Sequence, residues 1–453
     1  MPTDLTPAAG PLPPATWPEI EFGDGDRILV LAPHPDDESL ATGGVIQRAL
    51  AGGHPVHVVF LTLGDNNEWS FMVYRKRPEF LPWQVRAMGE VRHGEALAAA
   101  RTLGLPPDSL TFLGYPDFGT LHIWCSHWGE ASPLRSMLTR VTAVPYPDAY
   151  RKGAEYKGDE IVRDLADALR EHRPTHVFVS HPADHNPDHA SLYLFTQIAL
   201  WELAGELHPQ VHPFLVHYPR WPRPHGLAPG ATIAPPEHLS RRCDWHALQL
   251  TGDEVSRKRE ALQAHQTQYG YCREYLESFI RTDELYGDFG VLPLAAAGGP
   301  GVSLGSEAGG PAMEPAEELE DEERERFVGV ESHVVRLVDG SLELSIGLSR
   351  PLAREVTASL YCFGYRADRP FAGMPKLHVE VGEIRHRVAD QERALPGDAV
   401  EVRREAHEIV IRVPLEAIGR PRRVLLSAAT RFGDLPLSSQ PWRILELATP
   451  EAG

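Results

Sequence analysis

The stretch that decides the fold is residues 27–38, which read RILVLAPHPDDE. Its first half is a continuous apolar run, the pattern of a strand buried on both faces of a parallel sheet. Its second half leads into a helical pattern over residues 45–50, and a further apolar run follows at residues 57–62. Together these segments predict a β-α-β unit.

The alternation continues along the chain. A helical pattern over residues 86–103 stops at Gly104, and an apolar run follows at residues 110–116. A further amphipathic helix is expected at residues 161–170 and a further buried strand at residues 175–180. Alternating strands and helices predict an α/β fold with a Rossmann-like, doubly wound, mostly parallel sheet.

The composition changes after this region. Residues 298–310 include six glycines, and residues 314–326 hold eight acidic residues and two arginines. Such a segment cannot bury a core, so we expect a linker. Period-two alternation beyond it predicts an all-β sandwich. The expected division is an N-terminal arm at 1–24, an α/β domain at 25–295, a Gly-rich and acidic linker at 296–326, and a β-sandwich domain at 327–453.

Charge and hydropathy exclude several classes of partner. The 453 residues carry a formal net charge of −19, which disfavours nucleic acids and anionic lipid surfaces. No apolar run reaches the length of a membrane span, and the N-terminus lacks a signal-peptide pattern, so we expect a cytoplasmic protein. The sequence is compatible with an oligomer of identical chains.

Chemistry-bearing residues follow the first predicted strand. His34, Asp36 and Asp37 lie where ligand sites form in open α/β sheets, outside the carboxyl end of a strand. His34 and Asp37 can reach one metal ion, while Asp36 stays free to hold a water molecule. An imidazole with a carboxylate is a zinc-type ligand pair that needs one or two more protein ligands.

A second cluster, HPADHNPDH at residues 181–189, follows the predicted strand at 175–180 and offers a third ligand. An isolated H-x-x-D pattern is more often a helix N-cap, because Asp and Asn favour that position. Two such clusters after two strands of one sheet favour a metal site.

These motifs resemble the LmbE-like or PIG-L family of zinc-dependent N-deacetylases, which remove acetyl groups from N-acetylglucosamine-type substrates. The resemblance rests on PHPDDE at residues 33–38 and DHNPDH at residues 184–189. RHGEALAAARTLG at 92–104, FLGYPD at 112–117 and KREALQAHQTQ at 258–268 are similar to further family blocks. It covers about residues 26 to 285.

The resemblance implies a metal centre with a general base. His34, Asp37 and His189 match the metal ligands, and Asp36 matches the base. The implied metal is Zn²⁺, with Fe²⁺ as the alternative. Three protein ligands would leave one coordination position open for water, as in catalytic zinc sites.

The chain departs from the commonest family form at Asn186, where many members have a histidine that supports the oxyanion. An asparagine amide can donate a hydrogen bond there but supplies neither a proton nor a positive charge. We expect His185 or His181 to substitute, and Asp188 to orient a neighbouring imidazole. His212, His217 and His225 are interpreted as surface or loop residues without a role.

Arg92 and Asp117 match family positions that face the sugar, where charged groups can bind hydroxyls. The alternative for Arg92 is an ordinary helix-surface pair with Glu95.

Two long irregular segments, residues 66–82 and 121–156, predict binding walls or, alternatively, an extra packing layer. Trp69, with Trp124 and Trp128, is the candidate for stacking on a saccharide ring, although packing is the commoner role of buried aromatics.

The expected function is metal-dependent hydrolysis of an N-acetyl group on an N-acetylglucosamine-type sugar or glycoconjugate. One alternative is an amidase for a thiol-sugar conjugate or a bulkier N-acyl substrate. Another is a non-catalytic carbohydrate-binding protein whose metal site is vestigial and whose sandwich is the active module. The sandwich aromatics suit either a core or a glycan-binding face: Tyr361, Phe363, Tyr365, Phe371, Phe432 and Trp442.

Overall fold

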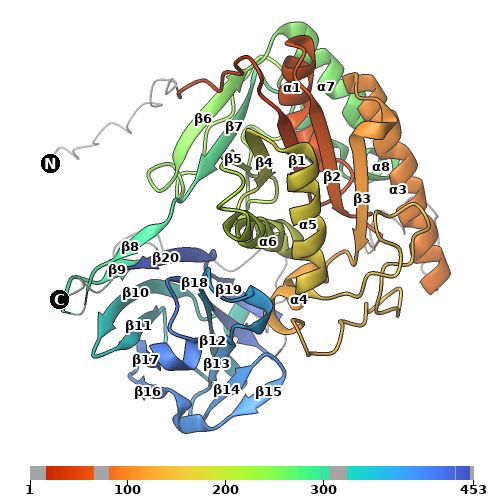
Figure 1. The fold of residues 1–453 in the computed structure, drawn as a ribbon. Coiled ribbons are helices and arrows are strands. Elements are labelled where there is room, and N and C mark those ends of the chain that lie inside the picture. The colour runs from red at the N-terminus through yellow and green to blue at the C-terminus, as the bar shows by residue number, and fades with distance from the viewer. Residues whose placement is uncertain (1–16, 66–80, 297, 306–323, 434, 449–453) are drawn as a thin grey trace, which may run out of the picture.

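The computed structural model describes residues 17–65, 81–296, 298–305, 324–433 and 435–448. The first part of these residues forms an α/β domain (Figure 1). Its strands are β1 (Ile28–Ala32), β2 (Val56–Thr62), β3 (Leu110–Tyr115), β4 (His176–Ser180), β5 (Gln210–Phe214), β6 (Asp244–Gln249) and β7 (Asp283–Asp288). Its helices are α1 (Asp37–Ala51), α3 (Pro82–Leu103), α4 (Thr120–Ser126), α5 (Gly158–His172), α6 (Pro187–Glu202), α7 (Gly252–Ala264) and α8 (Gln266–Glu277).

The seven strands form one sheet in the order β3-β2-β1-β4-β5-β7-β6. Strands β1 to β5 pair in parallel, and the β6–β7 pair is antiparallel. The predicted mostly parallel α/β fold is therefore confirmed. The strand order reverses between β1 and β4, and ligand crevices of open α/β sheets form at such a switch point.

Local sequence explains where the helices begin and end. Helix α3 ends at Gly104, which adopts φ 94°, a conformation that costs a glycine little. Helix α1 begins at Asp37, eight residues before the predicted pattern. Asp37 and Glu38 fill its first turn, where negative charge is stabilised by the helix dipole. The metal motif therefore lies at a helix N-terminus as well as at a strand end.

The C-terminal part of the chain is a β-sandwich of two sheets, in the orders β16-β17-β11-β10-β9 and β15-β14-β13-β12-β18-β20-β8, with β19 paired to β18. Its strands are β8 (Leu292–Leu294), β9 (Val302–Ser303), β10 (Val330–Val338), β11 (Ser341–Leu348), β12 (Val356–Tyr365), β13 (Lys376–Val381), β14 (His386–Asp390), β15 (Arg393–Leu395), β16 (Glu401–Arg404), β17 (Glu408–Pro414), β18 (Arg423–Phe432), β19 (Leu435–Ser439) and β20 (Arg443–Leu447). The predicted β-rich C-terminal half is confirmed.

The domain boundaries expected from the sequence stay predictions. Much of the expected linker, residues 306–323, lies outside the described residues, as does the arm before residue 17. Two short strands in front of that segment already join the sandwich: β8 pairs with β20, and β9 pairs with β10. Among the described residues, no helix has the length and apolar character to cross a membrane.

The sandwich lies below the α/β sheet in Figure 1, on the side of α4 and α6. One apolar cluster runs through both parts, because Phe363, Phe371 and Trp442 of the sandwich pack with residues of the α/β core. A second cluster fills the interior of the sandwich itself. The two parts therefore share a buried interface.

Candidate metal centre

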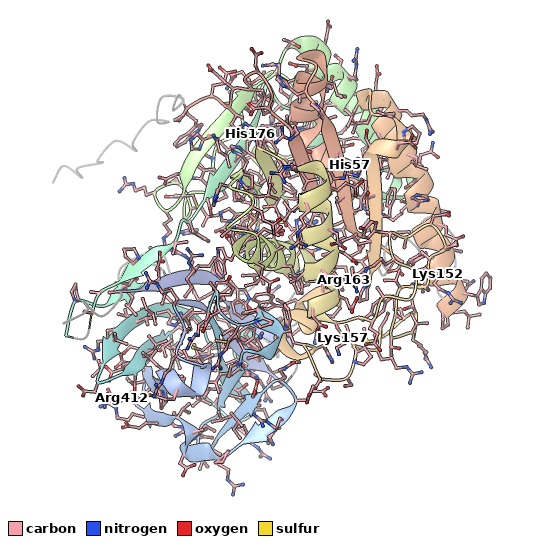
Figure 2. The ribbon with its side chains drawn as sticks, in the orientation of Figure 1. His57, Lys152, Lys157, Arg163, His176 and Arg412 are labelled. Carbon is pink, nitrogen blue, oxygen red and sulfur yellow. The ribbon has the colours of Figure 1, made fainter. Side chains whose placement is uncertain are left out.

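The two sequence motifs converge at one end of the sheet. His34 lies in the loop between β1 and α1, and His189 lies in the first turn of α6, which follows β4. The opposite end of the sheet carries His57 and His176, at the amino ends of β2 and β4 (Figure 2). The strand order therefore brings together residues that are 155 positions apart.

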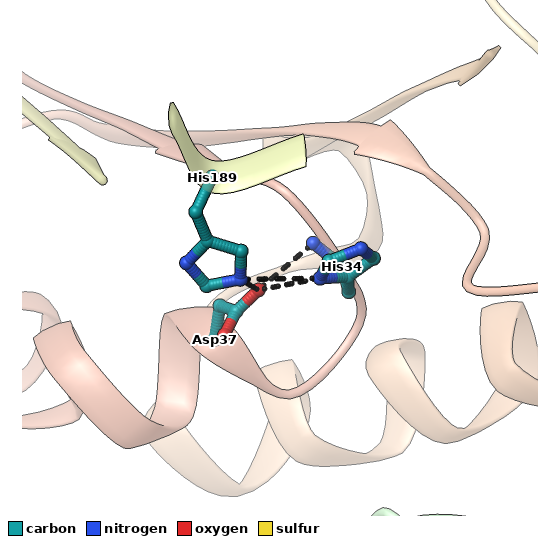
Figure 3. A group of neighbouring side chains, drawn as sticks. All are labelled: His34, Asp37 and His189. Atoms are coloured by element: carbon teal, nitrogen blue, oxygen red, sulfur yellow. Dashed lines mark hydrogen bonds and ion pairs between the residues drawn. The ribbon is translucent and has the colours of Figure 1, made fainter. Parts of the chain in front are cut away.

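Three ligand atoms form a small triangle (Figure 3). His34 Nδ1 lies 3.2 Å from Asp37 Oδ2, His189 Nε2 lies 3.1 Å from the same oxygen, and the two nitrogens are 3.3 Å apart. Bonds of 2.0–2.1 Å at tetrahedral angles place ligand atoms about 3.3–3.4 Å apart. Donor types and spacing both fit a divalent metal such as zinc, so the residues fit the implied group.

A carboxylate backs each imidazole on the side away from this triangle. His34 Nε2 lies 3.1 Å from Asp117 Oδ1 and 3.2 Å from Asp188 Oδ2, and His189 Nδ1 lies 3.1 Å from Asp184 Oδ2. Metal-binding histidines commonly have such a partner, which fixes the ring and makes it a better ligand.

The same carboxylates make the local potential negative. Burial opposes protonation of both rings, yet Asp117, Asp188 and Asp37 together raise the pKa of His34 well above its ordinary value. Asp184 and Asp37 together likewise outweigh burial and raise the pKa of His189 to about 9. The cluster therefore favours a positive charge at this point.

A second group of three ligand atoms comes from His34, Asp117 and Asp188, but hydrogen bonds already occupy it. Asp188 Oδ1 accepts from the Thr120 N–H (3.1 Å) and hydroxyl (2.5 Å), and Oδ2 accepts from the Phe118 N–H (2.5 Å). Little lone-pair capacity remains on Asp188 for a metal. Of the two groups, the His34, Asp37 and His189 triangle is therefore the better candidate for a metal site, and Asp188 lies where it can orient His34.

Asp36, the expected base, is held in an unusual backbone conformation. Its φ is 129°, a region that L-residues rarely adopt. The Asp36 N–H donates to Glu38 Oε2 at 2.9 Å, and the Glu38 carboxylate also pairs with His265 Nε2 at 2.9 Å. Sequence reasoning gave Glu38 and His265 no role, although both lie within the quoted motifs.

The side chain of Asp36 faces the guanidinium of Arg92. Arg92 Nη2 lies 3.5 Å from Asp36 Oδ2. Burial raises the pKa of Asp36 to about 7, while Arg92 pulls that pKa down. A carboxyl with this pKa can exchange a proton near neutral pH, which suits a general base.

The structure changes the interpretation of Arg92 and Asp117. Arg92 is only 2% exposed and donates to the carbonyls of Gly64 (3.0 Å) and Pro35 (2.7 Å). The helix-surface pair is therefore wrong, and Glu95 instead accepts from Thr267. Asp117 is also buried, against His34. Direct contact of these two side chains with a sugar stays a prediction.

The residues of the second motif, 181–189, differ in burial and in the contacts they make. Asn186 is the N-cap of α6, and its Oδ1 accepts from the Asp188 N–H at 2.9 Å. His185 is exposed, with its ring 5.4 Å from that of Tyr218. His181 is fully buried, and burial lowers its pKa to about 3. His181 is therefore wrong as a substitute acid, while the role of His185 stays a prediction.

Of the histidines expected in surface or loop positions, His217 does lie in a loop, but His212 lies within β5. His212 is buried, and His217 lies beside the metal centre, with its ring 4.8 Å from that of His189. The signal was present in the sequence: the short apolar run FLV at residues 214–216 precedes His217 and begins at the end of β5, a strand of the same sheet.

The described part of residues 121–156 presents no tryptophan for stacking on a sugar. Trp124 and Trp128 are fully buried, so they pack and do not stack on a sugar. For these two tryptophans the alternative interpretation, an extra packing layer, fits the structure. Trp69 lies outside the described residues.

A family model described as GlcNAc-PI de-N-acetylase (PIG-L) matches residues 29–200. These residues form a PIG-L domain. The PIG-L domain contains the three triangle residues and Asp36, whereas His217 lies beyond the matched segment.

Curated relatives share the PIG-L segment. A 1D-myo-inositol 2-acetamido-2-deoxy-alpha-D-glucopyranoside deacetylase of Mycobacteroides abscessus is 32% identical over 39% of this chain and 58% of its own length. A protein of the same description from Saccharopolyspora erythraea is 32% identical over 38% of this chain and 53% of its own length. The chain thus spans little more than half the length of these relatives.

Among solved structures, an N,N'-diacetylchitobiose deacetylase of Pyrococcus horikoshii matches at 18% identity and a TM-score of 0.35. The match covers 58% of this chain and 83% of that protein. A TM-score this low supports no inference about function.

Replacing Asp184 with asparagine is expected to weaken Zn²⁺ binding by ~10–100-fold, the usual effect of losing a carboxylate behind a metal-binding histidine. Competition with a chromophoric chelator measures the dissociation constant. Asp244→Asn, at the start of β6, is the matched control. Equal affinities of the two variants would show that Asp184 does not support His189.

Replacing Arg92 with glutamine is expected to move the acid limb of the kcat/KM profile to higher pH. Loss of the positive charge favours the neutral form of Asp36, so its pKa rises above about 7. A higher pH is then needed to ionise the Asp36 carboxyl. Arg92→Lys keeps the charge and should leave the limb near its original position. Identical limbs in all three proteins would contradict the assignment.

Proposed function

We propose that the chain is a zinc-dependent N-deacetylase that hydrolyses the acetamido group of an N-acetylglucosamine-type sugar in a small glycoconjugate. One observation carries the proposal: His34, Asp37 and His189 present three ligand atoms 3.1–3.3 Å apart, with Asp36 next to them in the chain. The PIG-L match of the same segment supports it.

Zinc is the metal that this donor set favours. Two imidazole nitrogens and one carboxylate oxygen suit Zn²⁺, with Fe²⁺ as the alternative. A bound Zn²⁺ would polarise the amide carbonyl and lower the pKa of water at the open coordination position.

Asp36 then acts as the general base and, after the C–N bond breaks, as the general acid. Its carboxylate takes the proton of the attacking water and returns it to the leaving amine. Arg92 keeps a fraction of Asp36 ionised, and the Glu38 and His265 pair fixes the backbone that carries it.

We assign His217 the task that Asn186 does not perform, donation of a hydrogen bond to the oxyanion. Its half-buried ring lies against His189 and stacks on Tyr275, with centroids 5.9 Å apart. Burial and then His189 lower the pKa of His217 to about 4, so it is a neutral imidazole at pH 7. A neutral imidazole still carries one N–H donor.

His217→Ala is therefore expected to lower kcat by ~10²–10³-fold with little change in KM, as removal of an oxyanion donor does in other hydrolases. The exposed loop histidine His225 offers the matched control, His225→Ala, which should behave as the unmodified protein. A rise in KM alone would instead assign His217 to substrate binding.

The substrate class follows from the relatives. Their shared description names a 2-acetamido sugar joined to inositol, so that conjugate is the first candidate. Acetyl is the acyl group in that description, and a bulkier acyl group or a thiol conjugate is not favoured. The complete set of three ligands and a base also disfavours a vestigial site.

The proposal is tested by measuring release of primary amine from a panel of acetamido sugars with the zinc-loaded protein. N-acetylglucosaminyl-inositol, N,N'-diacetylchitobiose and free N-acetylglucosamine form the panel, each paired with its N-butyryl analogue. We expect amine release from at least one acetamido sugar and little from its analogue. Zinc-loaded protein that releases amine from none of them would overturn the proposed function.

A further inference from the structure

Helix α4 joins the metal centre to the C-terminal sandwich. Its first residue, Thr120, contacts Asp188 beside the metal ligands, and Trp124, one turn later, contacts the sandwich. The helix has only seven residues, so a displacement at one end reaches the other.

The turn before α4 sets the orientation of His34. Asp117 lies 3.1 Å from His34 Nε2, and the Phe118 and Thr120 N–H groups hold Asp188, which lies 3.2 Å from the same nitrogen. Both carboxylates behind His34 therefore depend on the path of residues 117–120.

That path is strained. Phe118 adopts φ 55°, a left-handed conformation that is uncommon for a bulky residue. Such conformations persist only where the surrounding structure fixes them. Contacts of the following helix, α4, are therefore needed to hold residues 117–120 in this conformation.

The sandwich supplies this support. The ring of Trp124 lies 5.4 Å from Phe371, 5.7 Å from Phe363 and 5.8 Å from Trp442, all of the sandwich. Trp124 also lies 5.3 Å, edge to face, from Phe195 of α6, the helix that carries Asp188 and His189.

Further contacts join the end of α4 to the sandwich. The Trp128 ring lies 4.9 Å from that of Phe371, and the Trp128 backbone N–H donates to Gln391 Oε1 at 2.8 Å. Phe363 and Phe371 are fully buried and Trp442 is 6% exposed, so these three aromatics cannot stack on a glycan. Buried apolar contacts of this kind favour one arrangement of the sandwich relative to the α/β part.

We propose that the β-sandwich is a positioning element of the metal centre: through Phe371 and Trp124 it fixes α4, and through Asp117 and Asp188 it fixes the ring of His34. The inference rests on the proposed metal site but not on the proposed substrate. The sandwich is accordingly part of the catalytic unit and not an accessory that binds glycans with these aromatics.

The test compares two buried phenylalanines of the sandwich in the full chain. Phe371→Ala removes the contact with Trp124, whereas Phe327→Ala opens the separate interior cluster of the sandwich. Both variants should lower Tm. Only Phe371→Ala should weaken Zn²⁺ binding, by ~10-fold, and change the visible spectrum of the Co²⁺-loaded protein, because only it alters the groups behind a ligand. Phe371→Leu, which fills most of the space, should restore both values toward those of the unmodified protein.

Thr120→Val provides the reference from the other end of α4, since it deletes the hydroxyl donor to Asp188. We expect it to reproduce the change in Zn²⁺ affinity without a large loss of Tm. The inference is overturned if Phe371→Ala and Phe327→Ala bind Zn²⁺ equally and give the same Co²⁺ spectrum. If the unmodified protein binds no metal at these residues, it is the proposed function that fails.

Discussion

His34→Ala is expected to yield purified protein without bound metal and without measurable amine release. Structural zinc sites bind with roughly 10–16 kcal/mol shared among four ligands, so loss of one ligand costs about 3–4 kcal/mol, or two to three orders of magnitude in affinity. The variant also leaves Asp117 and Asp188 facing each other without the imidazole between them. Metal content per chain, measured by mass spectrometry, checks this result.

His57→Ala is the matched control, because His57 lies at the amino end of β2, at the other end of the sheet. It should retain about one metal ion per chain, as expected for a single site. Full metal content in His34→Ala would contradict the assigned ligand set.

Asp36→Asn is expected to retain the metal and lose ~10²–10⁴-fold in kcat, the usual contribution of a general base. Asparagine has nearly the same shape and tolerates positive φ better than most residues, so the strained backbone at φ 129° should persist. Its amide cannot accept the proton of water. Single-turnover rates and metal content are measured on the same preparation.

Loss of metal from Asp36→Asn would mean that Asp36 is a ligand and not the base. Unchanged kcat with metal retained would assign the base to another group. Asp253→Asn, in the first turn of α7, is the matched control for the chemical change.

The sequence was sufficient to predict the fold because the apolar runs at residues 27–32, 57–62 and 175–180 are buried strands of one sheet. It was also sufficient to predict that the two clusters meet, since carboxyl ends of parallel strands lie at one edge, whereas His189 was identified as the third ligand only through the family resemblance. This part of the site depends on local pattern and a general rule of sheet geometry.

The groups that support the triangle depend on long-range packing and could not be predicted in this way. Asp117 follows β3, which lies two places from β1 in the sheet, so its contact with His34 depends on the path of residues 117–120. The pairing of Glu38 with His265 spans 227 residues. From the sequence alone, the sandwich aromatics suited either a core or a surface. Only the structure shows that Trp124 of α4 packs against them.

The proposed function requires that a metal held by His34, Asp37 and His189 drives deacetylation. This requirement is tested by amine release from N-acetylglucosaminyl-inositol by protein that has been stripped with a chelator and then titrated with Zn²⁺. We expect no release by the stripped protein and full recovery at about one equivalent of Zn²⁺, as expected for a single catalytic site. Release that continues undiminished after the metal is removed would contradict it.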